Sequence, residues 1–320
     1  MSSSERCSDY AVETENLVKT YGDDVVAIDG INLTIEANTI YALLGPNGAG
    51  KTTTLSILTT LLEPTSGSAA VCGLDVVKRA DEVRGRIGVT FQETVLDDAL
   101  TGRQALDFHG RLYSLDKAKR QEKIAELLSL VELEEAGDRK IRTYSGGMKR
   151  RLELIRGLMT EPDVLFLDEP TLGLDPQSRS RLGEYILDLK RERGLTLLLT
   201  THYMDEAELL ADKVGIIDHG KIVIEGSPRE LVDQMGADAI HIAGSGNSEA
   251  FVEGLRQLVY TETITATGNH IQVGVDSGNR RLVDVVTVAG EKAFHIEEIS
   301  VAKPSLGDVF LHFTGRQFRD

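Results

Sequence analysis

The sequence of 320 residues has little cysteine, no tryptophan and no long apolar run. Its two cysteines, Cys7 and Cys72, do not have the spacing of a metal-ligand or redox motif, which argues against a disulfide framework. The longest apolar runs, such as VLFL at 164–167, fall far short of the roughly 20 residues that a membrane-spanning helix needs. The polar start MSSSERCSDY also lacks the apolar stretch of a secretory signal. We therefore expect a cytoplasmic chain that does not itself cross a membrane.

Positive charge is also scarce, because 35 Lys and Arg residues stand against 51 Asp and Glu residues and give a net charge of -16. An excess of negative charge disfavours direct binding to nucleic acid or to anionic lipid headgroups. The length is sufficient for one large domain or two ordinary ones, each with a buried core. The composition therefore indicates a globular protein whose partners are not polyanions.

The stretch LLGPNGAGKTTT, residues 43–54, fits a phosphate-binding loop. It matches the pattern Gly-x-x-x-x-Gly-Lys-Thr, follows an apolar strand and opens a helix, which is the context that this motif requires. Glycines allow consecutive backbone N–H groups to curl round phosphates at the positive end of the helix. We expect Lys51 to reach the β and γ phosphates and Thr52 to ligate Mg²⁺. The predicted loop residues are Gly45, Pro46, Asn47, Gly48, Ala49, Gly50, Lys51, Thr52 and Thr53.

The segment DVLFLDEP, residues 163–170, is an apolar run that ends in two carboxylates. In a nucleotide site Asp168 at the strand tip would hold Mg²⁺, and strand alternation would turn Glu169 the other way, where it can polarise the attacking water. On its own such a segment is usually a solvated strand end. The phosphate-binding loop upstream favours the catalytic interpretation.

A third motif, YSGGMKRRLELIRGLM at 144–159, places Ser145-Gly146-Gly147 at the head of an amphipathic helix. It resembles the signature of ATP-binding-cassette (ABC) proteins, and the resemblance covers residues 12 to about 230. The resemblance implies further site residues: Tyr21 stacks on adenine, Gln92 contacts Mg²⁺ and water, Asp175 in GLD belongs to the nucleotide site, and His202 in LLLTTHYMDEAE contacts the γ-phosphate.

The signature departs from the usual Leu-Ser-Gly-Gly-Gln at Tyr144 and Met148. These changes, and PSLGDVFLHFTG at 304–315, are similar to those of the daunorubicin-resistance drug exporters. Because Met148 stands where a capping box would have Glu, we expect the Ser145 hydroxyl and nearby N–H groups to be available to the γ-phosphate bound by a second copy. The basic run KRR at 149–151 is interpreted as a solvated helix face.

The predicted fold class is α/β, with a nucleotide-binding domain at 12–235 after a flexible N-terminus at 1–11. The patterns predict a small antiparallel β subdomain at 11–42, a helical subdomain at about 97–160, and parallel strands joined by crossover helices. Residues 236–320 read strand, helix, strand, strand, helix, strand, which is the order of a ferredoxin-like α+β domain. We expect this domain to steady the dimer or its contact with the membrane subunit, with the closing helix SLGDVFLHF docking there through Leu306, Val309, Phe310 and Phe313.

The resemblance implies an ATP hydrolase that serves an ABC transporter, as an exporter subunit. Two copies would sandwich two ATP molecules and drive a separate transmembrane permease, which places the chain at the cytoplasmic face of the membrane. Residues 97–150, with the Gln92 loop, would receive the permease. Two alternatives stay open at this point. One is a soluble ABC ATPase that acts on nucleic acid or ribosomes, although such proteins generally carry two cassettes, and the other is a small-molecule kinase, which has no use for the signature.

Overall fold

The computed structural model describes residues 7, 9–22, 25–93, 95–236 and 238–315. The chain divides into two compact units, Met1–Ile222 and Val223–Asp320. This boundary precedes the expected one at 235, because helix α8 (Pro228–Asp233) packs against the closing helix α11 (Leu306–Thr314) of the second unit. Every nucleotide motif predicted from the sequence lies in the first unit.

The first unit opens with a small antiparallel sheet that the sequence predicts only in part, because residues 40–42 lie in the parallel main sheet and the strands at 66–75 were not expected. Its strands β1 (Tyr10–Tyr21), β2 (Val25–Glu36), β4 (Ser66–Val71) and β5 (Leu74–Asp75) have the order β2-β1-β4-β5. Strand β1 begins inside the stretch 1–11 that we expected to be flexible, and residues 1–6 and 8 of that stretch lie outside the described part. Alternate residues of β2, such as Ile31, Leu33 and Ile35, are buried against the rest of the unit.

The main sheet has the order β10-β9-β3-β8-β7-β6. Its strands are β3 (Ile40–Leu44), β6 (Ile87–Thr90), β7 (Val164–Asp168), β8 (Thr196–Thr201), β9 (Lys213–Asp218) and β10 (Lys221–Gly226). The pairs formed among β6, β7, β8, β3 and β9 are parallel. Strands β3, β7 and β8 are buried along their whole length, because both faces of a parallel sheet are covered.

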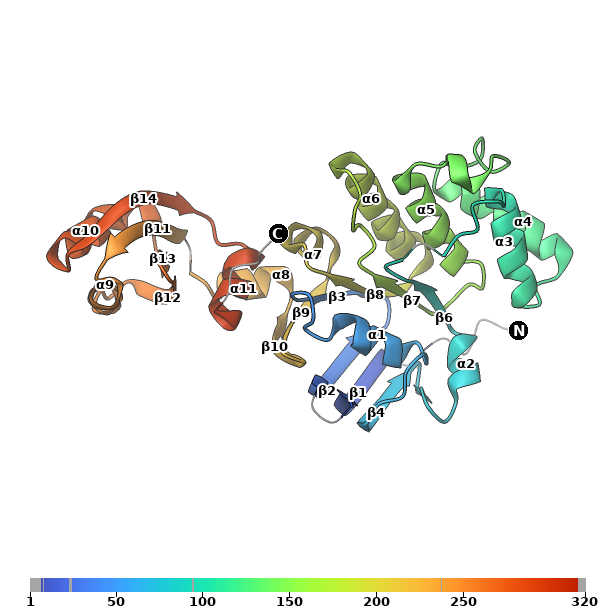
Figure 1. Cartoon of the computed structure of the whole chain (residues 1–320), viewed down its shortest axis with the longest axis horizontal. Coiled ribbons are helices and arrows are strands. Elements are labelled where there is room, and N and C mark those ends of the chain that lie inside the picture. Colours follow the sequence, from blue (N-terminus) through green and yellow to red (C-terminus); the bar gives the residue numbers. More distant parts are fainter. Residues whose placement is uncertain (1–6, 8, 23–24, 94, 237, 316–320) are drawn as a thin grey trace. The chain divides into compact units, whose positions relative to one another are not determined.

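Helices cover this sheet and shape the site. In Figure 1, α5 (Gly146–Gly157) and α6 (Pro176–Arg193) lie on one side of the parallel strands, and α1 (Lys51–Leu58) lies on the other side with the antiparallel sheet. The remaining helices of this unit are α2 (Ala80–Arg84), α3 (Gly102–Leu112), α4 (Lys117–Leu130), the short 3-10 helix η1 (Ile141–Thr143) and α7 (Met204–Leu210). The helical segment predicted at 97–160 thus contains α3, α4, η1 and α5.

The second unit has the predicted ferredoxin-like order. Strands β11 (Asp238–Gly246), β12 (Thr261–Thr267), β13 (His270–Val275) and β14 (Phe294–Ala302) form an antiparallel sheet of order β12-β13-β11-β14. Helices α9 (Ser248–Arg256) and α10 (Gly278–Glu291) share its hydrophobic core with residues such as Phe251, Val273 and Phe294.

The closing helix α11 is largely buried within its own unit. Leu306, Val309 and Phe310 are buried, and the helix packs against α8 and β12. Phe313 is 38% exposed. Only one of the four side chains that we expected to dock on a partner is therefore accessible at the surface of this unit.

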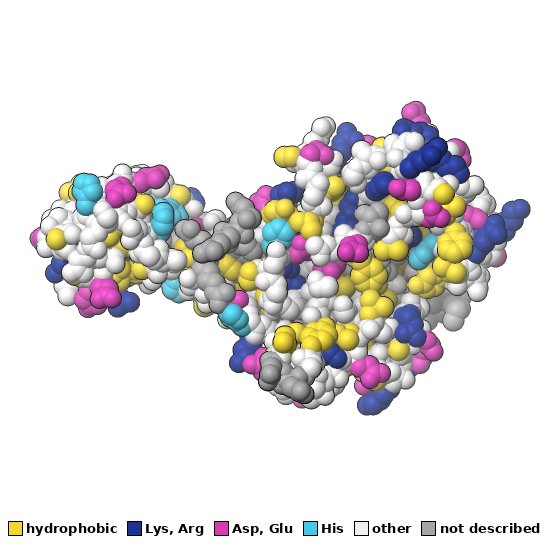
Figure 2. Space-filling view, viewed as in Figure 1, with side chains coloured by type: hydrophobic (Ala, Val, Ile, Leu, Met, Phe, Trp, Pro, Cys, Tyr) yellow, Lys and Arg dark blue, Asp and Glu magenta, His cyan; other side chains and the backbone are white. Residues whose placement is uncertain are grey.

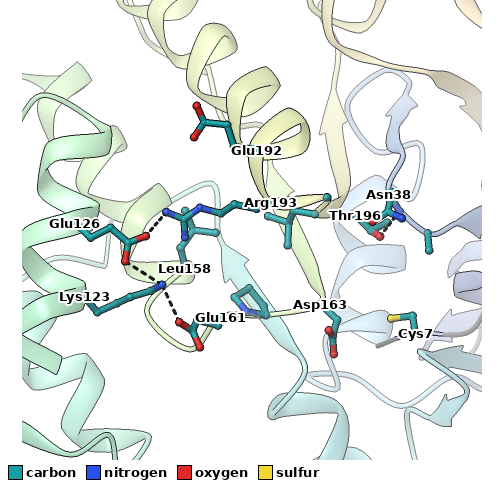
Figure 3. A pocket seen from close by; sticks show the side chains of 14 residues that line it. Cys7, Asn38, Lys123, Glu126, Leu158, Glu161, Asp163, Glu192, Arg193 and Thr196 are labelled. Atoms are coloured by element: carbon teal, nitrogen blue, oxygen red, sulfur yellow. Dashed lines mark hydrogen bonds and ion pairs between the residues drawn. The ribbon is translucent and has the colours of Figure 1, made fainter. Parts of the chain in front are cut away.

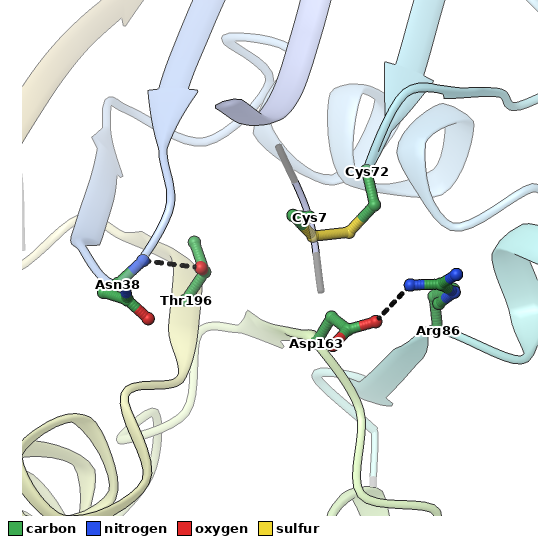
Figure 4. The surroundings of a disulfide bond; sticks show 6 residues. All are labelled: Cys7, Asn38, Cys72, Arg86, Asp163 and Thr196. Atoms are coloured by element: carbon green, nitrogen blue, oxygen red, sulfur yellow. Dashed lines mark hydrogen bonds and ion pairs between the residues drawn. A yellow bond between two sulfur atoms is a disulfide. The ribbon is translucent and has the colours of Figure 1, made fainter. Parts of the chain in front are cut away.

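Cys7 and Cys72 form a disulfide bond, so the expectation of unlinked cysteines was wrong (Figure 4). Their Cα atoms lie 4.4 Å apart although 65 residues separate them in the sequence. The antiparallel register of β1 and β4, in which Val12 faces Val71, brings the two cysteines together. Spacing along the chain carries no information about such a pairing, and the cysteines no longer support the expectation of a cytoplasmic chain.

Within the described residues, no helix combines the length and apolar character that crossing a membrane would require. On the face shown in Figure 2, Lys and Arg side chains gather over the helices α3–α5, and Asp and Glu side chains are scattered. The net negative charge is therefore distributed and does not form one acidic face in this view.

Candidate active site

The predicted phosphate-binding loop connects the end of β3 to the start of α1. Gly50 is the N-cap residue of α1 with a φ of 108°, and a Cβ there would lie 2.6 Å from the carbonyl oxygen of Ala27. A Cβ at Gly45 would lie 2.4 Å from the carbonyl oxygen of Ile217, so both ends of the loop require glycine. Helix α1 has no side-chain cap and no acid in its first turn. Its N-terminal N–H groups therefore suit an anionic ligand.

Lys51 is turned back into this loop and is only 4% exposed. Its Nζ donates to the carbonyl oxygens of Gly45 at 2.7 Å and Pro46 at 3.2 Å, and lies 3.2 Å from Glu169 Oε1. Burial lowers the pKa of Lys51, and the attraction of Glu169 opposes that shift. The ammonium group is thus held where the loop would receive phosphates.

Asp168 ends β7 beside two hydroxyl groups. Thr200 Oγ1 donates to Asp168 Oδ1 at 2.6 Å and Thr52 Oγ1 donates to the same oxygen at 3.3 Å. Burial raises the pKa of Asp168, and both hydrogen bonds oppose that shift. The structure therefore brings together the predicted ligands Thr52 and Asp168, and both offer oxygen atoms, which Mg²⁺ prefers.

Glu169 lies one residue beyond β7, with a left-handed backbone φ of 46°. Its N–H donates to Thr200 Oγ1 at 3.0 Å. Its Oε1 lies 3.2 Å from Lys51 Nζ. Its Oε2 lies 3.2 Å from His202 Nδ1, and these two atoms do not form a hydrogen bond. The expected orientation by strand alternation was wrong, because the left-handed residue ends the strand pattern. Asp168 and Glu169 both face the phosphate-binding loop.

His202 follows β8 and is fixed by the residues around it. The Tyr203 N–H donates to Thr201 Oγ1 at 3.0 Å, and that hydroxyl in turn donates to Glu206 Oε2. Glu206 is 5% exposed, and burial raises its pKa to about 7 although the hydrogen bond from Thr201 opposes the shift. The guanidinium of Arg179 lies 4.0 Å from the ring centre of Tyr203. Sequence reasoning missed Glu206, although its spacing from the buried Ala207 and Leu210 places it on the inner face of α7.

The signature serine caps its helix, contrary to the expectation that its hydroxyl is free of the helix donors. Ser145 Oγ accepts from the Met148 N–H at 3.2 Å, because the N-cap geometry does not depend on an acid three residues later. A Cβ at Gly147 would lie 2.6 Å from Ser178 Oγ, and that hydroxyl donates to Asp175 Oδ2 at 2.7 Å. Asp175 is the N-cap residue of α6. The signature and the GLD segment are thus neighbours.

Within the described residues, the other predicted residues outside the phosphate-binding loop form no hydrogen bond or ion pair with Lys51, Asp168, Glu169 or His202. Tyr21 ends β1 and is 43% exposed, with Lys19 Nζ 5.5 Å from its ring centre. Gln92 is exposed beyond β6, and Ser145 and Gly146 are exposed at the start of α5. The roles of these residues in nucleotide binding stay predictions.

The interpretation of KRR as a solvated helix face was wrong. Arg150 is 6% exposed, Arg151 donates to the carbonyl oxygen of Val131 at 2.7 Å, and Lys149 pairs with Asp98 at 2.7 Å. Helix α5 is enclosed by neighbouring segments on several sides, which its sequence pattern does not reveal. Arg150 is a second residue that sequence reasoning missed.

A cavity of about 760 Å³ lies at the opposite edge of the sheet, before the first residues of β7 and β8 (Figure 3). Both of its cations are paired with carboxylates, because Lys123 Nζ lies 2.9 Å from Glu161 and 3.2 Å from Glu126, and Arg193 pairs with Glu126 at 2.6 Å. Hydrogen bonds from Lys123 and Lys119 lower the pKa of Glu161 to about 2. We interpret this cavity as an ion-pair network between packed elements.

Comparison with known proteins shows the family to which the chain belongs. The ABC transporter family model matches residues 28–172. The chain is 40% identical to "Daunorubicin resistance ATP-binding protein DrrA2" of Streptomyces coeruleorubidus, with 96% of each chain covered. It is 38% identical to a "Nod factor export ATP-binding protein I" of Cupriavidus metallidurans, which covers 97% of this chain and 99% of that protein.

Solved structures of ATP-binding cassettes also resemble this chain. The chain resembles CbiO1 from Clostridium perfringens, part of the ABC transporter complex CbiONQ, with a TM-score of 0.66 and 28% identity over 78% of this chain and 96% of that one. It also resembles a dimeric ATP-binding cassette bound to ADP and phosphate, with a TM-score of 0.61 and 26% identity over 68% of this chain and 98% of that one.

The parallel sheet, phosphate-binding loop, paired carboxylates and signature helix define an ATP-binding and ATP-hydrolysing cassette. Within that class the chain belongs to the family of ABC transporter ATP-binding proteins, on the strength of its similarity to full-length relatives.

Proposed function

We propose that this chain is the ATPase subunit of an exporter, in which two copies enclose two ATP molecules between the phosphate-binding loop of one copy and the signature of the other. The observation that carries the proposal is that the Glu169 carboxylate lies 3.2 Å from both Lys51 Nζ and His202 Nδ1, at the carboxyl edge of the sheet. Ser145 and Gly146 are exposed, which suits contact with a nucleotide held by a second copy. Relatives named for drug resistance and Nod factor export support an export function.

Thr52 and Asp168 would hold Mg²⁺, with Gln92 as a third ligand. The fit rests on the hydroxyl and carboxylate oxygens of Thr52 and Asp168, which already lie in hydrogen-bond contact. When bound, the ion neutralises negative charge on the phosphate oxygens.

The residues of the chain then divide the work of hydrolysis. The loop N–H groups and Lys51 hold the phosphates, and Tyr21 stacks on adenine. Glu169 polarises the attacking water, while Lys51 orients its carboxylate from one side. His202 contacts the γ-phosphate, and the bonded series Tyr203, Thr201 and Glu206 fixes the backbone around it. These groups stabilise the negative charge that develops on the phosphate in the transition state, and they keep the reacting groups in the correct orientation.

The permease would bind at the helical subdomain, on the cytoplasmic side of the membrane. Phe108 and Leu112 lie one helical turn apart on α3 and are 57% and 65% exposed, and Val95 in the nearby loop is 62% exposed. Figure 2 shows hydrophobic side chains at the surface beside α3. An acidic chain also suits the basic cytoplasmic loops of membrane proteins.

Substitution of Glu169 by Gln tests the catalytic proposal. The variant keeps size and hydrogen bonding but removes the charge that polarises water, so kcat should fall about 10²-fold or more while ATP still binds. Size-exclusion chromatography with ATP should show a stable dimer. The exposed Glu184→Gln is the matched control and should hydrolyse normally. Normal hydrolysis by Glu169→Gln would remove this carboxylate from the mechanism.

A further inference from the structure

Arg150 on α5 makes an unusual set of hydrogen bonds to backbone carbonyl oxygens. Its Nε donates to Pro170 at 2.6 Å, and its Nη2 donates to Asp168 at 2.8 Å and to Glu169 at 2.9 Å. Its Nη1 donates to Phe91 at 2.6 Å. The side chain is only 6% exposed, so these bonds are protected from competing water.

These carbonyl groups belong to the segments that carry the proposed chemistry. Asp168 and Glu169 are the carboxylates of the site, and Phe91 immediately precedes Gln92. The guanidinium group is rigid and planar, with several donors in fixed directions, so it sets the carbonyl groups of both segments in one relative position. One side chain of the signature helix therefore connects the end of β7 to the loop that follows β6.

Two more residues on the same face of α5 extend this connection. Glu153 Oε2 lies 3.2 Å from Arg150 Nη1, and its Oε1 accepts from the Val95 N–H at 2.9 Å. Arg156 Nη1 donates to the Val95 carbonyl oxygen at 3.0 Å. Residues 150, 153 and 156 recur every three positions and hence lie along one side of the helix. Phe91 and Val95 are thus both bound to α5.

We propose that Arg150 is a positioning residue for ATP hydrolysis, which holds the Asp168-Glu169 peptide and the Gln92 loop in one geometry relative to the signature helix. A displacement of α5 or of the loop then changes the position of the Glu169 carboxylate. The inference rests on the proposed roles of Glu169 and Gln92 in the reaction.

Arg150→Lys is the most direct test. Lysine keeps a positive charge beside the buried Glu153, so the ion pair is retained, but one ammonium group cannot reach the carbonyl groups of both segments. We expect kcat to fall by up to about 10²-fold, because small displacements of a catalytic group have effects of that size. The affinity for ATP should not change, because the phosphate-binding loop is held by β3 and α1. Both are measured on the full chain, by steady-state hydrolysis and by equilibrium ATP titration.

Arg151→Lys is the matched control. Arg151 neighbours Arg150 on the same helix and donates to the Val131 carbonyl oxygen, away from Asp168 and Glu169. The same chemical change there should leave kcat at the wild-type value. A thermal unfolding curve for each variant verifies that the protein is folded at the assay temperature.

Arg156→Met is the second variant, in case Arg150→Lys does not fold. It removes one of the two hydrogen bonds that hold Val95, whose N–H still donates to Glu153, and should lower kcat less than Arg150→Lys, again without a change in ATP affinity. Wild-type kcat in folded Arg150→Lys overturns the proposal, as does a parallel loss of ATP affinity and kcat. If Arg150→Lys is unfolded, wild-type kcat in Arg156→Met overturns it. Normal hydrolysis by Glu169→Gln would refute the proposed function itself, whereas an inactive Glu169→Gln beside a fully active Arg150→Lys refutes only this inference.

Discussion

Lys51 and Ser145 are proposed to contact the same ATP molecule from two different copies of the chain. Lys51 is buried in the loop of its own chain, whereas Ser145 is exposed and its hydroxyl accepts from its own helix. We expect Lys51→Ala to weaken ATP binding by the monomer by about tenfold to a hundredfold, because a hydrogen bond to a charged group contributes roughly 1.5–3 kcal/mol. Ser145→Arg should leave ATP binding by the monomer intact and block ATP-dependent dimerisation. Equilibrium titration and size-exclusion chromatography measure the two effects.

A mixture of the two variants provides the control. In a mixed dimer, one site combines an intact phosphate-binding loop with an intact signature, so the mixture should hydrolyse ATP faster than either variant alone. If folded Ser145→Arg failed to bind ATP as a monomer, the arrangement across two chains would be wrong.

Glu206 makes stability depend on pH. Burial raises its pKa from 4.5 to about 7, so the folded state keeps a proton that the unfolded state loses between these values. The stabilising contribution of Glu206 is complete below pH 4.5 and is lost as the pH rises through 7. Because Glu206→Gln does not titrate, its stability relative to the wild type should increase between pH 4.5 and 7 by up to about 3 kcal/mol and then level off.

Urea unfolding of both proteins across this range measures the difference. Comparison with the wild type is necessary, because burial lowers the pKa of His109 to about 4 and gives a pH dependence of opposite sign. The exposed Asp205→Asn is the matched control on the same helix. A difference between Glu206→Gln and the wild type that does not vary with pH would contradict the prediction.

At the scale of elements, the Cys7–Cys72 bond attaches the segment before β1 to the end of β4. It closes a loop with a sequence separation of 65 residues. Reduction, or Cys72→Ser, should lower the free energy of unfolding by about 2–4 kcal/mol, because the unfolded chain regains the entropy of the open loop. Denaturant unfolding with and without a reductant measures this change.

Cys7→Ser is the matched control for this bond. It should have the same effect as Cys72→Ser, and the double variant should be no less stable than either single one, because all three remove one bond. Two titratable thiols in the unreduced, unfolded protein would show that the bond does not form.

At the scale of the whole molecule, the unit boundary at residue 222 predicts how a shortened chain behaves. A chain that ends at Gly236 retains α8 but loses α11, against which α8 packs. Since α8 has only six residues, it should not remain helical without that packing. Residues 227–236 should therefore be cleaved by protease much faster in the shortened chain than in the full chain, as mass spectrometry would show.

ATP affinity provides the control for this truncation. It should match that of the full chain, both for the chain ending at Gly236 and for one ending at Gly226, because all nucleotide motifs precede these cuts. Protease resistance of residues 227–236 in the shortened chain would place α8 with the first unit. Loss of ATP binding by a folded shortened chain would place the second unit in the site.

The sequence by itself determined the elements and the chemical identity of the site. Glycine at positions 45 and 50 and the apolar strand before Asp168 are local features, and local backbone preferences and periodicity are sufficient to interpret them. The alternation of strands and helices likewise predicted the parallel strands of the main sheet and the ferredoxin-like order of the second unit.

Only the tertiary structure decided which distant groups meet. The direction of the Glu169 side chain depends on the left-handed backbone of Glu169 itself, whose N–H is bound by Thr200. The disulfide depends on the register of β1 with β4. The burial of Arg150 depends on two segments that pack against α5 from distant parts of the chain. Local sequence patterns do not determine strand register or long-range packing. Both depend on contacts between segments that are far apart in the sequence.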